Sequence, residues 1–155
     1  MSGDRLFGLT PRAYLAGWWR VDRTILDRRA GASGRFDGKA RFERAGETAL
    51  DYREEGEMRM GGASFRASRS YRWEFDEDDA RVLFPDGRPF HRLPPEGDTA
   101  LHDCPPDTYR VTYRFETADR WCQRWIVTGP RKDHTLESVF TRLHPPGDPV
   151  HLAPQ

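Results

Sequence analysis

A charged residue occupies a position in this sequence where an apolar residue is expected. Residues 65–75 alternate between apolar or aromatic residues at odd positions and polar residues at even positions, and Arg69 is the exception. A period of two is typical of a β-strand with one buried and one solvated face. An arginine on the buried face is costly unless it is paired. Arg69 is therefore either half of a structural ion pair or the contact for an anionic or carbonyl group of a ligand.

A hairpin turn at Gly61-Gly62 predicts which residue faces Arg69. Two glycines between alternating segments are typical of a two-residue turn. In that register Glu54 lies opposite Arg69 on the buried face, where it would orient the guanidinium. The same register pairs Glu57 with Arg66, Asp51 with Arg72, Tyr52 with Tyr71 and Leu50 with Trp73. Opposite charges thus meet on the solvated face and apolar residues meet on the buried one, whereas a one-residue slip would exchange the two faces.

Histidine and cysteine side chains form a second group that could do chemistry. His102 and Cys104 are two residues apart on a predicted strand and share a face, and His91 precedes them. They could ligate zinc or haem iron, or His102 could be the base for a Cys104 nucleophile. In the alternative interpretation His102 satisfies a buried polar group and Cys104 is a small core residue. We predict no metal site; haem bound through His91, His102 or His134 stays open as a minor alternative.

The elements that position these residues are predicted to be short strands separated by frequent turns. A helix at about residues 11–16 begins with a capping threonine and a proline. About ten strands follow, at 18–27, 35–43, 50–60, 63–75, 80–84, 88–93, 100–104, 108–116, 120–128 and 134–143. Hairpin connections without long crossovers predict an all-β fold, an antiparallel up-and-down barrel. Residues 1–143 form one domain and residues 144–155 a Pro-rich tail.

Composition excludes several classes of function. The chain has 155 residues, 32% of them charged, and a formal net charge of zero. A balanced charge predicts no nucleic-acid partner and no membrane surface as a partner. Two cysteines do not form a disulfide framework, and no signal-peptide pattern is present. We expect a cytoplasmic monomer or homodimer.

The predicted inward faces combine aromatic walls with a few polar groups, which is typical of a small-molecule pocket. Tyr52 and Ser138 belong to this inner set. The candidate ligand-binding residues are Arg23, Glu54, Arg69, Tyr71, Trp73, His102, Tyr109, Tyr113, Gln123 and Trp125. The alternative is an aromatic core in which the polar groups are satisfied internally.

Two sets of motifs resemble known families. Gly17-Trp18-Trp19 resembles the lipocalin Gly-x-Trp signature, and Arg142 resembles the arginine that packs across that tryptophan in the calycin superfamily. The segments at 90–93, 102–104, 107–109 and 129–133 are similar to a bacterial family, Domain of Unknown Function family 6314. This resemblance implies a lipocalin-like, calycin-like barrel and implies no activity.

Three hypotheses follow for the function. The first is a lipocalin-like barrel that binds a small hydrophobic or aromatic ligand with a polar or anionic end at Arg69. The second is an enzyme, a cyclase or isomerase, that uses the same pocket, with Glu54 as an acid of raised pKa. The third is a closed barrel whose loops recruit a protein partner. The sequence does not decide whether the protein is an enzyme.

Overall fold

The computed structural model describes residues 5–76, 79–94 and 99–144, and the predicted tail falls almost entirely outside this part of the chain. One short helix and ten strands confirm the predicted all-β class. The elements are α1 (Pro11–Leu15), β1 (Gly17–Asp27), β2 (Ala32–Ala45), β3 (Ala49–Met60), β4 (Ala63–Phe75), β5 (Ala80–Leu83), β6 (Pro89–Arg92), β7 (Thr99–Cys104), β8 (Asp107–Thr117), β9 (Arg120–Thr128) and β10 (Asp133–Leu143). Within the described residues, no helix is long and apolar enough to cross a membrane.

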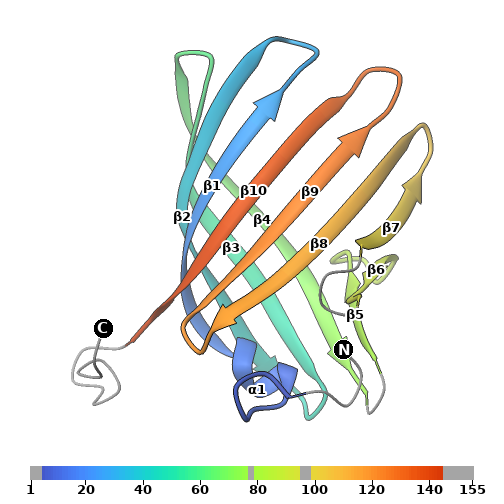
Figure 1. Cartoon of the computed structure of the whole chain (residues 1–155). Coiled ribbons are helices and arrows are strands. Elements are labelled where there is room, and N and C mark those ends of the chain that lie inside the picture. Colours follow the sequence, from blue (N-terminus) through green and yellow to red (C-terminus); the bar gives the residue numbers. More distant parts are fainter. Residues whose placement is uncertain (1–4, 77–78, 95–98, 145–155) are drawn as a thin grey trace.

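All ten strands belong to one antiparallel sheet that curls into a nearly closed barrel (Figure 1). The strand order is β6-β5-β4-β3-β2-β1-β10-β9-β8-β7, so β1 and β10 pair and the ends of the sheet are β6 and β7. The β3–β4 register is the predicted one, with Glu54 opposite Arg69. In the β8–β9 hairpin, Tyr113 lies opposite Gln123.

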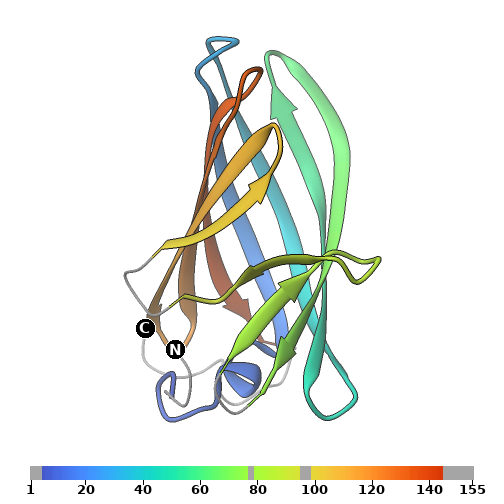
Figure 2. The same cartoon turned by 90° about the vertical axis from the view of Figure 1, so that its right-hand side faces the viewer.

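The two ends of the sheet are not joined by a strand ladder. Strand β4 pairs with β3 along its whole length but with β5 only over residues 72–75. In the part of the chain that the structure describes, β7 pairs with β8 alone. Figure 2 shows β7 and the β3–β4 hairpin on the two sides of this interval. The barrel is therefore hydrogen-bonded around most of its circumference and interrupted between β6 and β7.

Helix α1 covers one end of the barrel (Figure 1). Thr10 caps it by accepting a hydrogen bond from the backbone N–H of Ala13, and Tyr14 and Leu15 are buried. Trp19 donates its indole N–H to the carbonyl of Leu15 at 2.8 Å. The Arg142 guanidinium lies 4.2 Å from the centre of the Trp19 ring and donates to the Tyr14 carbonyl at 2.8 Å. The predicted contact between Arg142 and the first-strand tryptophan is therefore confirmed.

A pair of glycines lets neighbouring strands come unusually close at the bend of the sheet. Gly38 on β2 lies opposite Gly56 on β3. A Cβ atom at Gly56 would lie 2.2 Å from the Asp37 carbonyl oxygen and 2.5 Å from the Gly38 Cα. Glycine in a barrel strand marks such close backbone approaches. The next inward-facing pair in the same ladder is Ala40 with Glu54, so this close approach lies beside the buried polar residues described next.

Candidate functional site

Glu54 is the centre of the polar cluster inside the barrel, and its side chain is 2% exposed. Arg23 from β1 binds it through two parallel hydrogen bonds, from Nη1 to Oε2 at 2.5 Å and from Nη2 to Oε1 at 2.8 Å. Arg69 donates its Nε–H to Oε2 at 3.0 Å, and the Tyr52 hydroxyl donates to Oε1. Arg23 also donates its Nε–H to Ser138 Oγ at 2.6 Å. The predicted Glu54–Arg69 pair is thus part of a larger network whose strongest contact is Arg23.

The cluster carries more positive than negative charge. It holds two guanidinium groups, Arg23 and Arg69, and one carboxylate, Glu54. Tyr52 stays neutral because burial, together with the nearby Glu54 charge, raises its pKa well above 10. Buried charges are tolerated when they are paired, and Arg23 is fully paired. The excess charge therefore resides on Arg69, whose side chain is 26% exposed.

The second hypothesis required a raised pKa for Glu54, and the structure gives the opposite. Burial alone would raise the pKa of Glu54, but the hydrogen bond from Arg23 and the charges of Arg69 and Arg23 outweigh it and lower the pKa to about 2. A carboxyl group with this pKa is ionised at neutral pH and has no proton to donate. The proposed role of Glu54 as a general acid is therefore wrong.

The lowered pKa of Glu54 predicts acid sensitivity. The unfolded chain has a glutamate pKa near 4.5 and the folded chain about 2, so the charged form contributes about 3 kcal/mol to stability. This contribution is complete above about pH 5 and is lost as pH falls toward 2. Carboxyl ¹³C NMR should place the Glu54 titration below those of the surface glutamates, and urea unfolding at falling pH should show the loss. A Glu54 titration near pH 4.5 would contradict this prediction.

Arg69 keeps hydrogen-bonding capacity that the cluster does not use. Its Nε–H is bonded to Glu54, whereas its two terminal nitrogens have no hydrogen-bond partner among the described residues. The guanidinium lies 4.4 Å from the centre of the Trp125 ring and 5.7 Å from that of Tyr71. Cation–π contacts at these distances hold the planar group in one orientation. Arg69 therefore offers an oriented, partly solvated donor group beside aromatic rings.

A small cavity lies beside Arg69 in the barrel interior. Its volume is about 10 Å³, the space of about one water molecule. Such a space does not fit a haem, which leaves the haem alternative without a site in this interior. The residues that line it are Tyr52, Arg69, Tyr71, Trp73, Val82, Phe90, His91, Tyr113, Trp121, Gln123, Trp125 and Phe140.

Most of the predicted ligand-binding residues come together around this cavity. Arg69, Tyr71, Trp73, Tyr113, Gln123 and Trp125 line it. Arg23 and Glu54 stand behind Arg69 in the ion-pair network. Two others, His102 and Tyr109, do not line it but lie next to Phe90, with ring centres 5.1 and 5.6 Å from the Phe90 ring. Their half-buried side chains, with those of Tyr71 and Phe84, surround Phe90 where the interior meets solvent.

Sequence reasoning did not assign Phe90 and His91 to the ligand-binding set. They are consecutive residues of the four-residue strand β6, and both are buried. Alternation assigns consecutive residues to opposite faces, so it cannot predict that both are buried. The Phe90 ring contacts the rings of Tyr71, Phe84, His91, His102, Tyr109 and Trp125. Phe90 therefore lines the cavity and also contacts the half-buried rings of Tyr71, Phe84, His102 and Tyr109.

The other candidate residues, the histidines and Cys104, do not form a metal site among the described residues. Cys104 is exposed on β7, and the described residues contain no group of three or more potential metal ligands. The half-buried His134 has its Nε2 3.4 Å from an Asp27 carboxylate oxygen on β1. Burial lowers the pKa of His102, which keeps that side chain neutral at physiological pH. The interior site is thus built from Arg69, its aromatic neighbours and His91.

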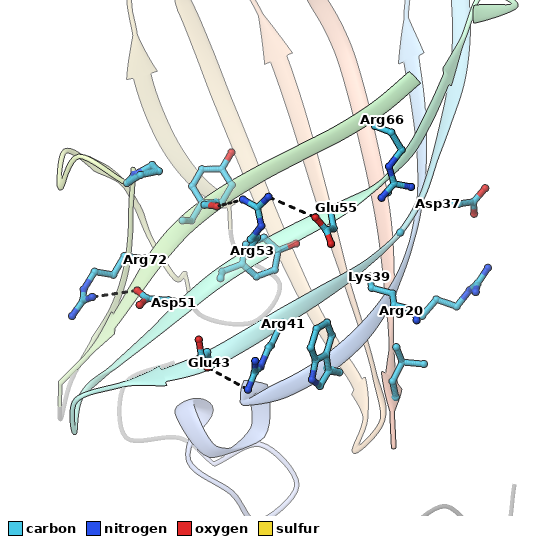
Figure 3. A pocket seen from close by; sticks show the side chains of 18 of the residues that line it. Arg20, Asp37, Lys39, Arg41, Glu43, Asp51, Arg53, Glu55, Arg66 and Arg72 are labelled. Atoms are coloured by element: carbon cyan, nitrogen blue, oxygen red, sulfur yellow. Dashed lines mark hydrogen bonds and ion pairs between the residues drawn. The ribbon is translucent and has the colours of Figure 1, made fainter. Parts of the chain in front are cut away.

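A larger hollow lies on the outer face of β1–β4 and has a volume of about 1330 Å³ (Figure 3). Its labelled side chains are charged and belong to the solvated face of the strands. Many are paired along the surface, for example Arg41 with Glu43 at 3.3 Å and Arg72 with Asp51 at 3.2 Å. Exposed pairs of this kind contribute little to stability or binding. The outer hollow is larger than the interior cavity, but its labelled groups are solvated or already paired. The cavity is lined by side chains with buried N–H groups that have no partner among the described residues, and by the partly exposed Arg69.

Known proteins of similar structure include an S-type phycobiliprotein lyase from Guillardia theta. It matches with a TM-score of 0.60 and 12% identity over 86% of this chain and 91% of that one. At this identity the likeness establishes the barrel fold alone.

Two designed barrels match more weakly. A redesigned β-barrel, mFAP1, bound to DFHBI, has a TM-score of 0.45 and 14% identity over 84% of this chain and 97% of that one. A fluorescence-activating β-barrel designed de novo has a TM-score of 0.45 and 13% identity over 85% of this chain and 96% of that one. No curated protein matches in sequence. A model of a family of unknown function, DUF6314, matches residues 15–142, and the chain therefore belongs to that family.

Proposed function

We propose that this protein binds a small apolar or aromatic molecule inside its barrel, with an acceptor group of that molecule at Arg69. The observation that carries the proposal is the excess positive charge on Arg69, which is oriented by Glu54 and two rings and keeps two nitrogens without partners among the described residues. A cation in such surroundings gains most from an anionic or strongly accepting group.

The body of the ligand is expected next to Phe90. The half-buried rings of Tyr71, Phe84 and Tyr109 surround it where the interior meets solvent. Aromatic rings bind flat apolar groups by stacking and edge contacts. Because the cavity beyond them holds only about one water, we expect the acceptor end to enter the cavity and the body to remain among these outer rings.

Removing the Arg69 charge should abolish most of the binding. We expect Arg69→Met to weaken binding of the fluorescent fatty acid cis-parinarate at least tenfold, since a charge-assisted hydrogen bond of about 1.5–3 kcal/mol is lost. Titration followed by parinarate fluorescence measures the change. The fold should survive, because Glu54 keeps its two hydrogen bonds from Arg23.

Arg66→Met is the matched control. Arg66 is on the same strand, but it is exposed and lines the outer hollow (Figure 3). This variant should bind parinarate as the wild type does. Loss of binding in Arg66→Met with retention in Arg69→Met would place the ligand on the outer face and overturn the proposal.

A further inference from the structure

Hydrogen bonds around His91 determine which of its ring nitrogens carries the proton. Gln123 donates an amide N–H to the Tyr113 hydroxyl at 3.1 Å, and that hydroxyl is 2.7 Å from His91 Nε2. If Nε2 carried a proton, the phenol would accept twice and its own proton would have no acceptor among the described residues. Tyr113 therefore donates to Nε2, and the proton of the neutral imidazole is on Nδ1. Burial, with a smaller effect of His102, lowers the pKa of His91 to about 3, which agrees with a neutral ring.

His91 is one of three cavity-lining residues whose side chains carry an unsatisfied N–H donor. His91 Nδ1, Trp121 Nε1 and Trp125 Nε1 are buried and have no hydrogen-bond partner among the described residues, and all three side chains line the cavity. Arg69 lines the same space with its two unpartnered terminal nitrogens. A buried donor without a partner is costly. Three such donors on residues that line one small space favour an acceptor from outside the protein.

Water satisfies these donors incompletely. A water molecule accepts two hydrogen bonds at most and must also place two protons of its own, whereas a carboxylate accepts about four and has none to place. A carboxylate also carries a single negative charge, which matches the single excess positive charge of Arg23, Arg69 and Glu54. A phosphate monoester carries close to two negative charges, which exceeds the single excess positive charge of these three residues.

We propose that the N–H groups of His91, Trp121 and Trp125, together with Arg69, form a carboxylate-binding site, and that the ligand is a carboxylic acid with a flat conjugated or aromatic body. This inference rests on the proposed function and adds the class of ligand and a role for His91. His91 is a specificity-determining residue. Its neutral N–H favours a ligand with a carboxylate head group over one with a hydroxyl head group on the same body.

The test compares two head groups on one body. We expect the full chain to bind cis-parinarate at least tenfold more tightly than cis-parinaryl alcohol, and we expect 2-naphthoate to displace parinarate more effectively than 2-naphthalenesulfonate. Equal affinity for acid and alcohol would leave interior binding of apolar molecules intact and overturn the carboxylate site. Failure of the wild type to bind either would overturn the proposed function as well.

Two substitutions of His91 separate its donor from its packing. The amide of His91→Gln reaches the Nε2 position and keeps the contact with Tyr113, but it lacks a donor at Nδ1. The amide of His91→Asn keeps a donor near Nδ1. We expect His91→Gln to weaken parinarate binding about tenfold or more and to reduce the preference for acid over alcohol, and His91→Asn to do so much less.

The outcomes of these substitutions are distinct. An equal loss for acid and alcohol in His91→Gln would make His91 a packing residue and overturn its role. Long-range ¹H–¹⁵N spectra of the unliganded wild type give an independent readout, since they distinguish the two imidazole tautomers. A proton on Nε2 would overturn the donor assignment whatever the binding results.

Discussion

Glu54→Gln is expected to cost about 3–5 kcal/mol of the free energy of unfolding, because it leaves two guanidinium groups without their shared anion. Arg23 is affected most, since its side chain is 3% exposed and both of its terminal nitrogens donate to Glu54. Small domains are stable by only about 5–15 kcal/mol in total. Urea unfolding followed by tryptophan fluorescence measures the loss.

Two further variants make this expectation specific. Glu55→Gln removes the next carboxylate along β3, which is exposed and 3.6 Å from Arg53, and should change stability by about 0.5 kcal/mol or less. The double variant Arg23→Met with Glu54→Gln removes both members of the buried pair and should recover part of the lost stability. A loss of less than about 1 kcal/mol in Glu54→Gln would show that the cluster is solvated.

Gly56→Ala should destabilise the barrel by about 3 kcal/mol or more, a large effect for one methyl group. The new Cβ would lie 2.2 Å from the Asp37 carbonyl oxygen and 2.5 Å from the Gly38 Cα. Both atoms belong to the backbone of β2, so neither can move aside as a flexible side chain would. Relief would require β2 and β3 to separate at the bend that surrounds the ion-pair network. Thermal unfolding of the purified variant measures the effect.

Gly61→Ala is the control for this prediction. Gly61 has a positive φ of 56°, and a Cβ there would meet nothing within 4 Å. Only conformational strain of about 1–2 kcal/mol is expected. If Gly56→Ala cost no more than Gly61→Ala, the close approach of β2 and β3 would be irrelevant to stability, contrary to our interpretation of the glycine pair.

The local pairing of this barrel was predictable from its sequence, whereas contacts between distant strands were not. The Gly61-Gly62 turn and the alternation on both sides of it determine the β3–β4 register, and the structure has that register. The contact between Arg23 and Glu54 joins β1 to β3 across β2, where Gly38 and Ala40 leave room between them. Alternation places Arg23 on the inner face but does not tell which of several inner charges it reaches.

The extent to which the interior is filled was also beyond sequence reasoning. Aromatic residues on the inner faces predict either the walls of a ligand pocket or a packed core. Which of the two forms depends on how the side chains of separate strands pack together. The structure places the Phe90 ring against those of Tyr71 and Trp125, and only a water-sized space is left beyond it. Both Phe90 and His91 of the short strand β6 are buried, and its pairing with β5 is irregular, which alternation does not predict.

The interruption of the sheet between β6 and β7 predicts that amide hydrogen exchange is faster at its ends than in its centre. Strand β6 is four residues long and has β5 as its only ladder partner among the described residues, whereas Glu54 and Arg23 lie on long strands that are paired on both sides. Amide protons of β5 and β6 should therefore exchange with solvent earlier than those of β1 and β3. Phe90 lies on β6, where exchange is expected to be fast, whereas Arg23 and Glu54 lie on β1 and β3, where it is expected to be slow. Under the proposed function, ligand entry past Phe90 depends on β6, whereas the stability of the ion-pair network depends on β1 and β3.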